Sequence, residues 1–405
     1  MDPSTVSYAG LLRFPDMLAL LCAASLSRLA GRMFAIVIVF HSLAAFGSAT
    51  LAGWIACAAI APGLLVSPLA GALLDRTGAA RGILIDLTVS AALMLALAVA
   101  VWLGVANPWV VLLLVALYAL TSPLSWAGIR VLLPRLVPAH ALDRANALDT
   151  ALYAAVDVVG PSLGGALLGF AGATGAFVAI AMAYGGAAVC FAFVGSAAPA
   201  PSSQGLIADA FEGVAIVFRR RLLRGLTIGY TLNMATWGIL IVAIPAFMAQ
   251  RSGTGTWEAS TGLLFTVAGL AGGIGALVAG HMRFLGREVG VMAGCMALTA
   301  LAAWPGAGGF GVIGIAAGLT IAGFLAGPID VGLLTLRQRR TEPEKLARVL
   351  AVSTSINMAG FAVGTALGGI LAAWSFTAAF IAAALTSLLA AMTTWGLIPK
   401  EDRGP

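Results

Sequence analysis

Two arginines and one aspartate lie in the middle of long apolar stretches, where ionised side chains are rare. Arg28 and Arg32 lie inside the apolar run 17–45, and their spacing of four places them on one face of a helix. Asp157 lies near the centre of a second run, 146–170. An ionisable group in an apolar environment is costly, so each of these residues is expected to have a charged partner or a function.

Two interpretations of these three residues remain open. In the first, one arginine pairs permanently with Asp157 and the ion pair only holds two helices together. In the second, Asp157 binds and releases a proton, because burial favours its neutral acid and a nearby arginine favours its carboxylate. The other arginine then faces an anionic or polar group of a ligand. Asp330 is a further carboxylate at depth, whereas Asp86 and Asp149 lie nearer the ends of their runs.

A second set of polar residues is available to contact a ligand. Asn233 and Trp237 stand one helical turn apart in the run 223–249, and Asn357 lies in the run 349–373. The alternative is that the asparagines only bond neighbouring helices and the tryptophan only packs. The predicted ligand-binding residues are therefore Arg28, Arg32, Asn233, Trp237, Asp330 and Asn357.

Metal and cofactor chemistry finds little support in the sequence. The three histidines do not form a site, and the four cysteines lie in apolar runs without CxxC spacing. No G-x-x-x-x-G-K-[ST] loop occurs, which disfavours ATP as the energy source. Clustered Ser, His or Asp residues at depth, which an intramembrane enzyme would need, are also missing. We expect no cofactor, no metal and no enzymatic activity.

The composition identifies a polytopic membrane protein. Of the 405 residues, 61% are hydrophobic and 9% are charged, and the mean hydropathy is +1.03, whereas roughly a quarter of a soluble protein is charged. The net charge of +6 comes from arginines gathered in a few loops, so no nucleic-acid partner is expected. Runs of about 20 apolar residues predict twelve membrane-spanning helices, near 17–45, 48–74, 83–104, 108–132, 146–170, 173–195, 223–249, 258–281, 288–304, 309–336, 349–373 and 376–398.

The distribution of arginine and lysine over the loops predicts how the chain is oriented. Loops on one side hold nearly all of these residues, and those on the other side hold only Arg251. Cytoplasmic loops of membrane proteins are enriched in Lys and Arg, so both termini are predicted to be cytoplasmic. Residues 1–16 lack the layout of a cleaved signal peptide, so the first helix is expected to be kept.

The chain is predicted to consist of two related halves. Residues 196–222 combine a Ser/Ala/Pro-rich linker with an amphipathic helix over 205–221. Prolines and glycines recur at an offset of about half the length, which indicates a duplicated six-helix unit with the ligand site between the halves. The predicted division is 1–195, 196–222 and 223–405. The repeated landmarks are Pro123 and Pro328, Pro138 and Pro343, and Gly160, Gly164 and Gly165 with Gly364, Gly368 and Gly369.

A short charged loop joins the second and third predicted helices. Its glycines permit a tight turn and its arginines mark the cytoplasmic side, as in an ordinary loop of this kind. The spacing G-x-x-x-D-R-x-G-x-x-R also resembles the signature loop of the major facilitator superfamily of transporters, although the residue before its last arginine is Ala80. The resemblance implies a conformational latch that bridges the two halves in one state. The residues concerned are Gly71, Asp75, Arg76, Gly78 and Arg81.

A glycine and proline motif follows Asp157 by one turn. Gly160-Pro161-Ser162-Leu163-Gly164-Gly165 by itself predicts a kinked and tightly packed helix. It is similar to the G-P-x-x-G-G core of helix 5 in antiporter branches of the superfamily, which are mostly proton-coupled exporters; the preceding glycine of those branches is Val156 here. The stretch 133–148 resembles the helix 4 to helix 5 connection of bacterial efflux members, including exporters of siderophores and drugs.

Taken together, the resemblance and the charged residues predict a transporter with two six-helix bundles around a central cavity. It is expected to act as a monomer in the bacterial inner membrane and to export a small amphipathic organic anion or zwitterion in exchange for protons. Asp157 would exchange the proton. The alternatives are uptake or facilitated diffusion of an organic anion without proton coupling, and a transporter-shaped sensor that binds its ligand without flux.

Overall fold

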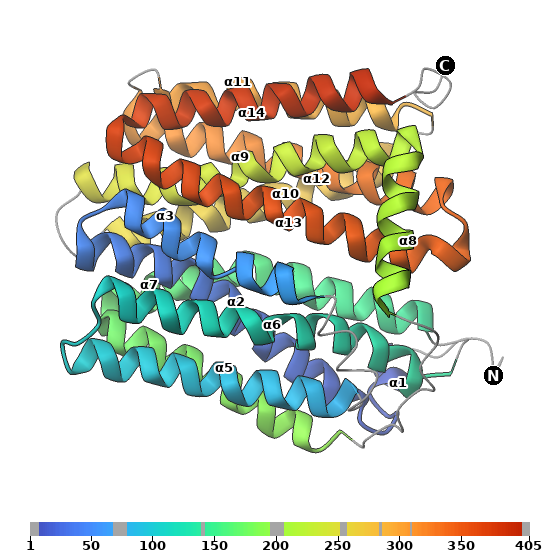
Figure 1. The fold of residues 1–405 in the computed structure, drawn as a ribbon, viewed down its shortest axis with the longest axis horizontal. Helices are drawn as coiled ribbons and strands as arrows, with labels where there is room; N and C mark the ends of the chain where they lie inside the picture. Colours follow the sequence, from blue (N-terminus) through green and yellow to red (C-terminus); the bar gives the residue numbers. More distant parts are fainter. Residues whose placement is uncertain are drawn as a thin grey trace. The chain divides into compact units, whose positions relative to one another are not determined.

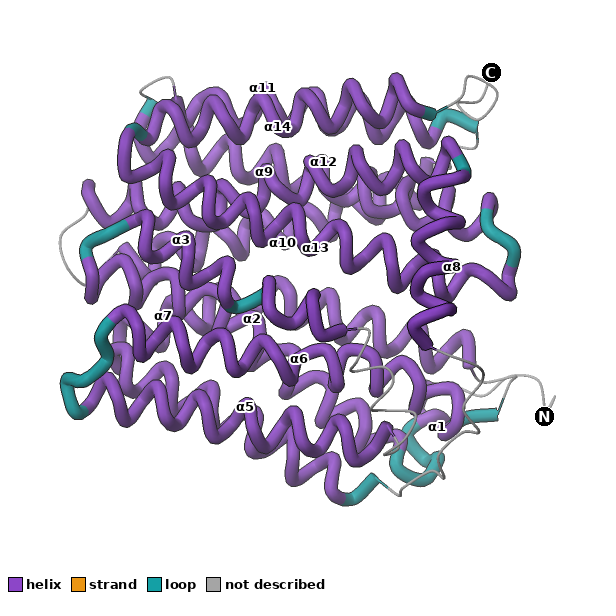
Figure 2. Tube along the Cα trace, in the orientation of Figure 1, coloured by secondary structure: helices purple, strands orange, loops and turns teal. Residues whose placement is uncertain are grey.

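The computed structural model of the chain consists of α-helices joined by loops (Figure 1), and Figure 2 shows no strand among the described residues. It describes residues 8–67, 79–138, 142–194, 206–251, 257–282, 286–307 and 310–398. The helices are α1 (Tyr8–Leu11), α2 (Met17–Phe46), α3 (Ala49–Ala58), α5 (Ala79–Trp102), α6 (Pro108–Leu136), α7 (Leu142–Ala192), α8 (Leu206–Arg219), α9 (Arg221–Arg251), α10 (Trp257–Met282), α11 (Glu288–Ala307), α12 (Gly311–Arg340), α13 (Pro343–Trp374) and α14 (Phe376–Leu397).

Local sequence signals explain where the helices begin and end. After α2, Gly47 adopts a φ of 62° and Ser48 accepts a hydrogen bond from the amide of Leu51 to start α3. The α5–α6 turn repeats this arrangement, with Gly104 at φ 70° and Asn107 as the N-cap of α6. Each cap accepts hydrogen bonds from first-turn amides that have no partner within the helix.

The membrane-spanning character of the helices agrees with the sequence-based expectation. Ten stretches among the described residues are long and apolar enough to cross a bilayer. One of them, Ala151–Ala192, contains the non-helical residue Gly172 (φ 66°, ψ −178°), which separates the two predicted helices 146–170 and 173–195. Trp109 and Phe170 expose 80% and 89% of their surface, as expected of side chains that face lipid. The count of twelve crossings and the cytoplasmic termini stay predictions.

Contacts within the chain group the helices into two compact units. One unit contains residues 1–37 and 61–206, and the other contains residues 38–60 and 207–405. The second unit thus includes α3, which packs against α13 where Gly53 meets Gly369. The predicted three-part division at residues 196–222 stays a prediction.

Glycine contacts set the helix spacing in the second unit. A Cβ at Gly238 of α9 would overlap the carbonyl oxygen of Phe361 in α13, and a Cβ at Gly364 of α13 would overlap that of Ala235 in α9. Gly275 of α10 meets the carbonyl oxygen of Phe324 in α12 in the same way. In a bilayer, such close backbone approach replaces the hydrophobic effect as a source of helix association.

Substitution of Gly275 tests this packing. The added methyl group of Gly275→Ala would collide with backbone, which cannot rotate away, so we expect a loss of about 1–3 kcal/mol in the free energy of unfolding. Gly273→Ala in the same helix is the matched control, because nothing lies within 4 Å of its added Cβ. The thermal midpoint of the purified protein in detergent measures both effects. Equal midpoints for the two variants would show that the α10–α12 contact is not tight.

Helix α8 (Leu206–Arg219) lies within the stretch 205–221, for which an amphipathic helix is predicted. Val217 is fully buried in an apolar cluster of the second unit, whereas Val214 and Phe218 expose 39% and 41% of their surface. In Figure 1, α8 runs across the direction of α9. Arg220, directly after α8, donates hydrogen bonds to the carbonyl oxygen of Arg340 (3.0 Å) and to Glu342 Oε1 (2.6 Å).

Candidate functional site

Two arginines and two aspartates of the first unit face one another between α2 and α7. Asp149, Tyr153 and Asp157 follow at intervals of four on α7 and therefore occupy one face of that helix. Arg28 and Arg32 have the same interval on α2. Two guanidinium groups thus meet two carboxylates, with a tyrosine ring between them.

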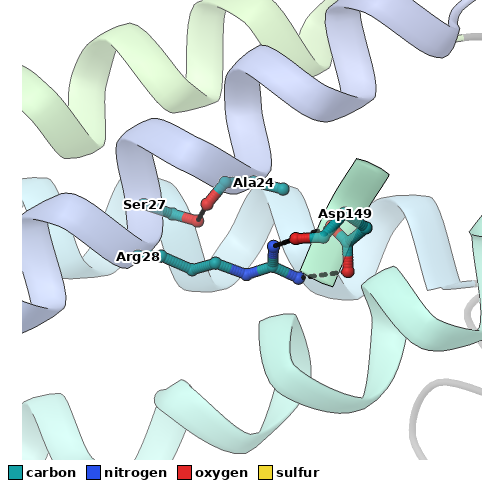
Figure 3. Close-up of polar contacts among 4 residues, drawn as sticks. All are labelled: Ala24, Ser27, Arg28 and Asp149. Carbon is teal, nitrogen blue, oxygen red and sulfur yellow. Dashed lines mark hydrogen bonds and ion pairs between the residues drawn. The ribbon is translucent and has the colours of Figure 1, made fainter. Parts of the chain in front are cut away.

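The first ion pair is a two-point contact between Arg28 and Asp149. Arg28 Nη1 donates to Asp149 Oδ1 at 2.7 Å and Arg28 Nη2 donates to Oδ2 at 3.0 Å (Figure 3). The two side chains are only 16% and 20% exposed. Their charges are matched and largely enclosed, which suits a structural role.

The second ion pair joins Arg32 to Asp157 and lies two turns further along α7 than Asp149. Arg32 Nη2 also donates to the hydroxyl of Tyr153 at 2.7 Å. The side chains of Arg32 and Asp157 are 41% and 37% exposed, more than twice the exposure of Arg28 and nearly twice that of Asp149. The Arg32–Asp157 pair is therefore more accessible than the Arg28–Asp149 pair.

Tyr153 links the two pairs. The guanidinium carbons of Arg28 and Arg32 lie 5.1 Å and 5.5 Å from the centre of its ring, within the range of cation–π attraction. Both guanidinium groups therefore contact the same ring. No group of three His, Cys, Asp or Glu residues in the part of the chain that the structure describes could hold a metal ion.

The glycine and proline motif positions this site. A Cβ at Gly160 would lie 2.5 Å from the Cβ of Arg32, and one at Gly164 would lie 3.1 Å from the carbonyl oxygen of Met33. Gly165 is buried on the same helix, and Pro161 lies inside it. The absence of side chains at Gly160 and Gly164 lets α7 approach α2 closely enough for Asp157 to reach Arg32.

The predicted ligand-binding residues of the other half belong to the second unit. Asn233 is 2% exposed, and its Oδ1 has no hydrogen-bond partner among the described residues. Trp237 is half-buried one turn later. Asn357 Oδ1 accepts from Thr231 at 3.2 Å, and Asp330 Oδ1 accepts from the hydroxyl of Tyr230 at 2.6 Å. Their role as ligand contacts stays a prediction.

The predicted latch is described only in part. Gly71, Asp75, Arg76 and Gly78 lie outside the described residues. Arg81 is exposed in the first turn of α5. The latch therefore stays a prediction.

Neither Asp149 nor Tyr153 is among the site residues predicted from the sequence. From the sequence, Asp149 lies nearer the end of its apolar run, and Asp157 is the predicted partner of one of the two arginines. The repeated interval of four on α7, matched by the same interval on α2, is the signal that would have found them. The buried pair of hydroxyl groups of Tyr118 and Tyr184, 2.7 Å apart, has no comparable sequence signal.

Charged side chains that face each other between two membrane helices are typical of the pathway of a transporter. A multi-pass membrane transporter is thus the class that this fold and site define. The sequence model described as Major Facilitator Superfamily matches residues 20–226 and 226–405. The chain belongs to this superfamily, and the membership predicted from its loop motif is confirmed.

Known proteins with the same architecture support this assignment. The chain is 49% identical over 395 residues to the uncharacterized MFS-type transporter y4rN of Sinorhizobium fredii, covering 97% of this chain and 98% of that protein. The nucleoside transporter NupG matches with a TM-score of 0.73 at 12% identity, over 94% of this chain and 98% of that one. A bacterial homologue of the iron transporter ferroportin, in an inward-facing state, matches with a TM-score of 0.71 at 17% identity, over 94% and 98%. At these identities the two solved structures show the fold alone.

Proposed function

We propose that this transporter is a proton-coupled antiporter of the bacterial inner membrane that exports a small amphipathic organic molecule carrying an anionic or zwitterionic group. The observation that carries the proposal is the ion pair of Arg32 and Asp157. Both residues lie inside membrane helices, and both side chains are more than a third exposed. An ion pair that only held helices together would be better enclosed, as Arg28 and Asp149 are.

A ligand can enter this pair by replacing either partner. A ligand ammonium group that binds Asp157 competes with a proton for the same carboxylate, which is the requirement for exchange of ligand against proton. A ligand carboxylate that binds Arg32 relieves Asp157 of its positive partner and favours protonation instead. A zwitterion satisfies both groups at once, so among the expected substrates it fits proton antiport best.

The other steps of the transport cycle follow from this competition between ligand and proton for Asp157. Protonation of Asp157 from the outer side breaks its contact with the ligand ammonium group and releases the ligand, and deprotonation on the inner side restores the site for the next ligand. Arg28, held by Asp149, keeps Tyr153 and α7 in place during the exchange. Asn233, Trp237, Asp330 and Asn357 are proposed to contact the ligand as well, and the loop with Asp75 would latch one conformation.

Proton release on ligand binding is the direct test. Candidate zwitterions and organic anions are added to the purified protein in weakly buffered detergent, with wild type and Asp157→Asn compared. At a pH low enough to protonate Asp157 in the ligand-free protein, we expect zwitterion binding to release up to about one proton per site in wild type and none in Asp157→Asn. Asp149→Asn serves as the control for loss of a carboxylate at the neighbouring, enclosed pair, and proton release should persist in it.

The sign of the pH change separates the alternatives. Proton uptake on binding of a simple anion would indicate transport of anion and proton in the same direction. Binding without any pH change, in wild type and variant alike, would refute proton coupling and leave Arg32 as a fixed anion clamp for uptake or facilitated diffusion. Binding without flux in liposomes would indicate a sensor.

A further inference from the structure

Arg337, in the last turn of α12, is a buried cation that the transport mechanism above does not use. Its residue surface is only 3% exposed, and its helix neighbours Leu333 and Leu336 belong to the buried apolar cluster of the second unit. Its Nε and Nη2 atoms have no hydrogen-bond partner among the described residues. A buried charge without a partner is strongly destabilising, so such an arrangement calls for a ligand.

Three nearby cations differ from Arg337 because they have carboxylate partners. Arg339 donates to Glu288 Oε1 at 2.8 Å, and Arg220 and Lys345 both reach Glu342. Hydrogen bonds from Lys345 and Arg220 lower the pKa of the Glu342 carboxyl, so it stays ionised and bound to them. Glu288 and Glu342 are thus both paired with cations other than Arg337.

Two more observations define the surroundings of Arg337. Thr341, the C-cap residue of α12 four positions later, is 6% exposed, and its hydroxyl oxygen also has no hydrogen-bond partner among the described residues. Tyr230 of α9 lies close enough to Arg337 for an electrostatic interaction, and its hydroxyl donates to Asp330. The buried groups around Arg337 without a hydrogen-bond partner in the described part of the chain are thus two guanidinium nitrogens and one hydroxyl.

The two unpaired nitrogens fix the chemistry of the ligand. Nε and Nη2 form the side edge of a guanidinium group, and their two N–H bonds run parallel, which matches two oxygens of a carboxylate or a phosphate. A cation would be repelled here, and a neutral ligand would leave the charge uncompensated. We infer that Arg337 and Thr341 form an oxyanion-binding site at the C-terminal end of α12, distinct from the ion pairs of α2 and α7. The oxyanion comes from a phosphate in solution or from the headgroup of an anionic lipid.

The site is tested by the thermal midpoint of the full-length protein. In neutral detergent, inorganic phosphate is titrated against sodium chloride at matched ionic strength. In nanodiscs, phosphatidylcholine alone is compared with phosphatidylcholine plus phosphatidylglycerol. We expect wild type to gain about 2 °C or more in at least one of the two arms, because a ligand that binds only the folded state stabilises it. The arm that responds identifies the source of the oxyanion.

Two variants and a control make the result specific. Arg337→Gln should lose the response and should fold at least as well as wild type without phosphate, because it removes an uncompensated charge. Thr341→Val should keep the charge and weaken the response, whereas Arg339→Gln, whose arginine is half-exposed and paired with Glu288, should respond like wild type. The inference is overturned if wild type responds in neither arm, or if Arg337→Gln responds as wild type does. Asp157→Asn should leave the response intact, so this test is independent of proton coupling.

Discussion

Replacing Gly160 by alanine is expected to lower transport by roughly tenfold or more and to destabilise the protein. The new methyl group would lie 2.5 Å from the Cβ of Arg32, so α7 must move away from α2 at the level of the Arg32–Asp157 pair. Overpacking of this kind costs about 1–3 kcal/mol, and about 1.4 kcal/mol changes the population of a conformation tenfold. Transport of the substrate identified by proton release, measured in liposomes, reports the loss.

The effect should follow the space available at each glycine of α7. Gly164→Ala brings its Cβ to 3.1 Å from the carbonyl oxygen of Met33 and should have a smaller effect. Gly185→Ala has nothing within 4 Å of the added Cβ and should behave as wild type. If all three variants transported alike, the close approach of α7 to α2 would not determine the geometry of the site. If Gly160→Ala kept its thermal midpoint and lost transport, the glycine would be needed for movement more than for packing.

Removing one partner of the Arg28–Asp149 pair is expected to destabilise the protein far more than removing both. Arg28→Met leaves a carboxylate enclosed between α2 and α7, and Asp149→Leu leaves a guanidinium there. Breaking a buried ion pair on one side costs about 3–5 kcal/mol, and because these side chains are 16% and 20% exposed, we expect about 3 kcal/mol. The double variant should recover most of this loss, because an apolar pair of similar volume is often neutral. Thermal midpoints of the four proteins complete the cycle.

The same cycle distinguishes the two ion pairs by function. The double variant of Arg28 and Asp149 should still release protons on ligand binding, because its Arg32 and Asp157 remain. Lys345→Gln is the stability control, since this lysine is partly exposed, its partner Glu342 keeps Arg220, and surface pairs contribute about 0–1 kcal/mol. A double variant no more stable than either single variant would show that the two charges do not stabilise the fold through each other. Loss of proton release in the double variant would place Arg28 in the coupling mechanism.

The sequence by itself determined the class of the protein and the position of most helices. Runs of about 20 apolar residues have few alternatives in a bilayer, where every backbone amide must be paired within the segment. Short signals then set the ends, such as Gly104 and Asn107 before α6 or Ser375 before α14. The charged loop motif and the superfamily match agree because both depend only on the order of residues along the chain.

Only the tertiary structure decided which charged residues meet. The choice of Asp149 for Arg28 and of Asp157 for Arg32 depends on the register of α7 against α2, and that register is set by the close contacts of Gly160 and Gly164. Hydropathy carries no information about register, because a shift of α7 by one turn leaves every residue in the same apolar run. The unpaired edge of Arg337 is likewise invisible in sequence, where it is one of several arginines in a basic loop. Burial and pairing are properties of neighbours distant in the chain, so they appear only once the helices are packed.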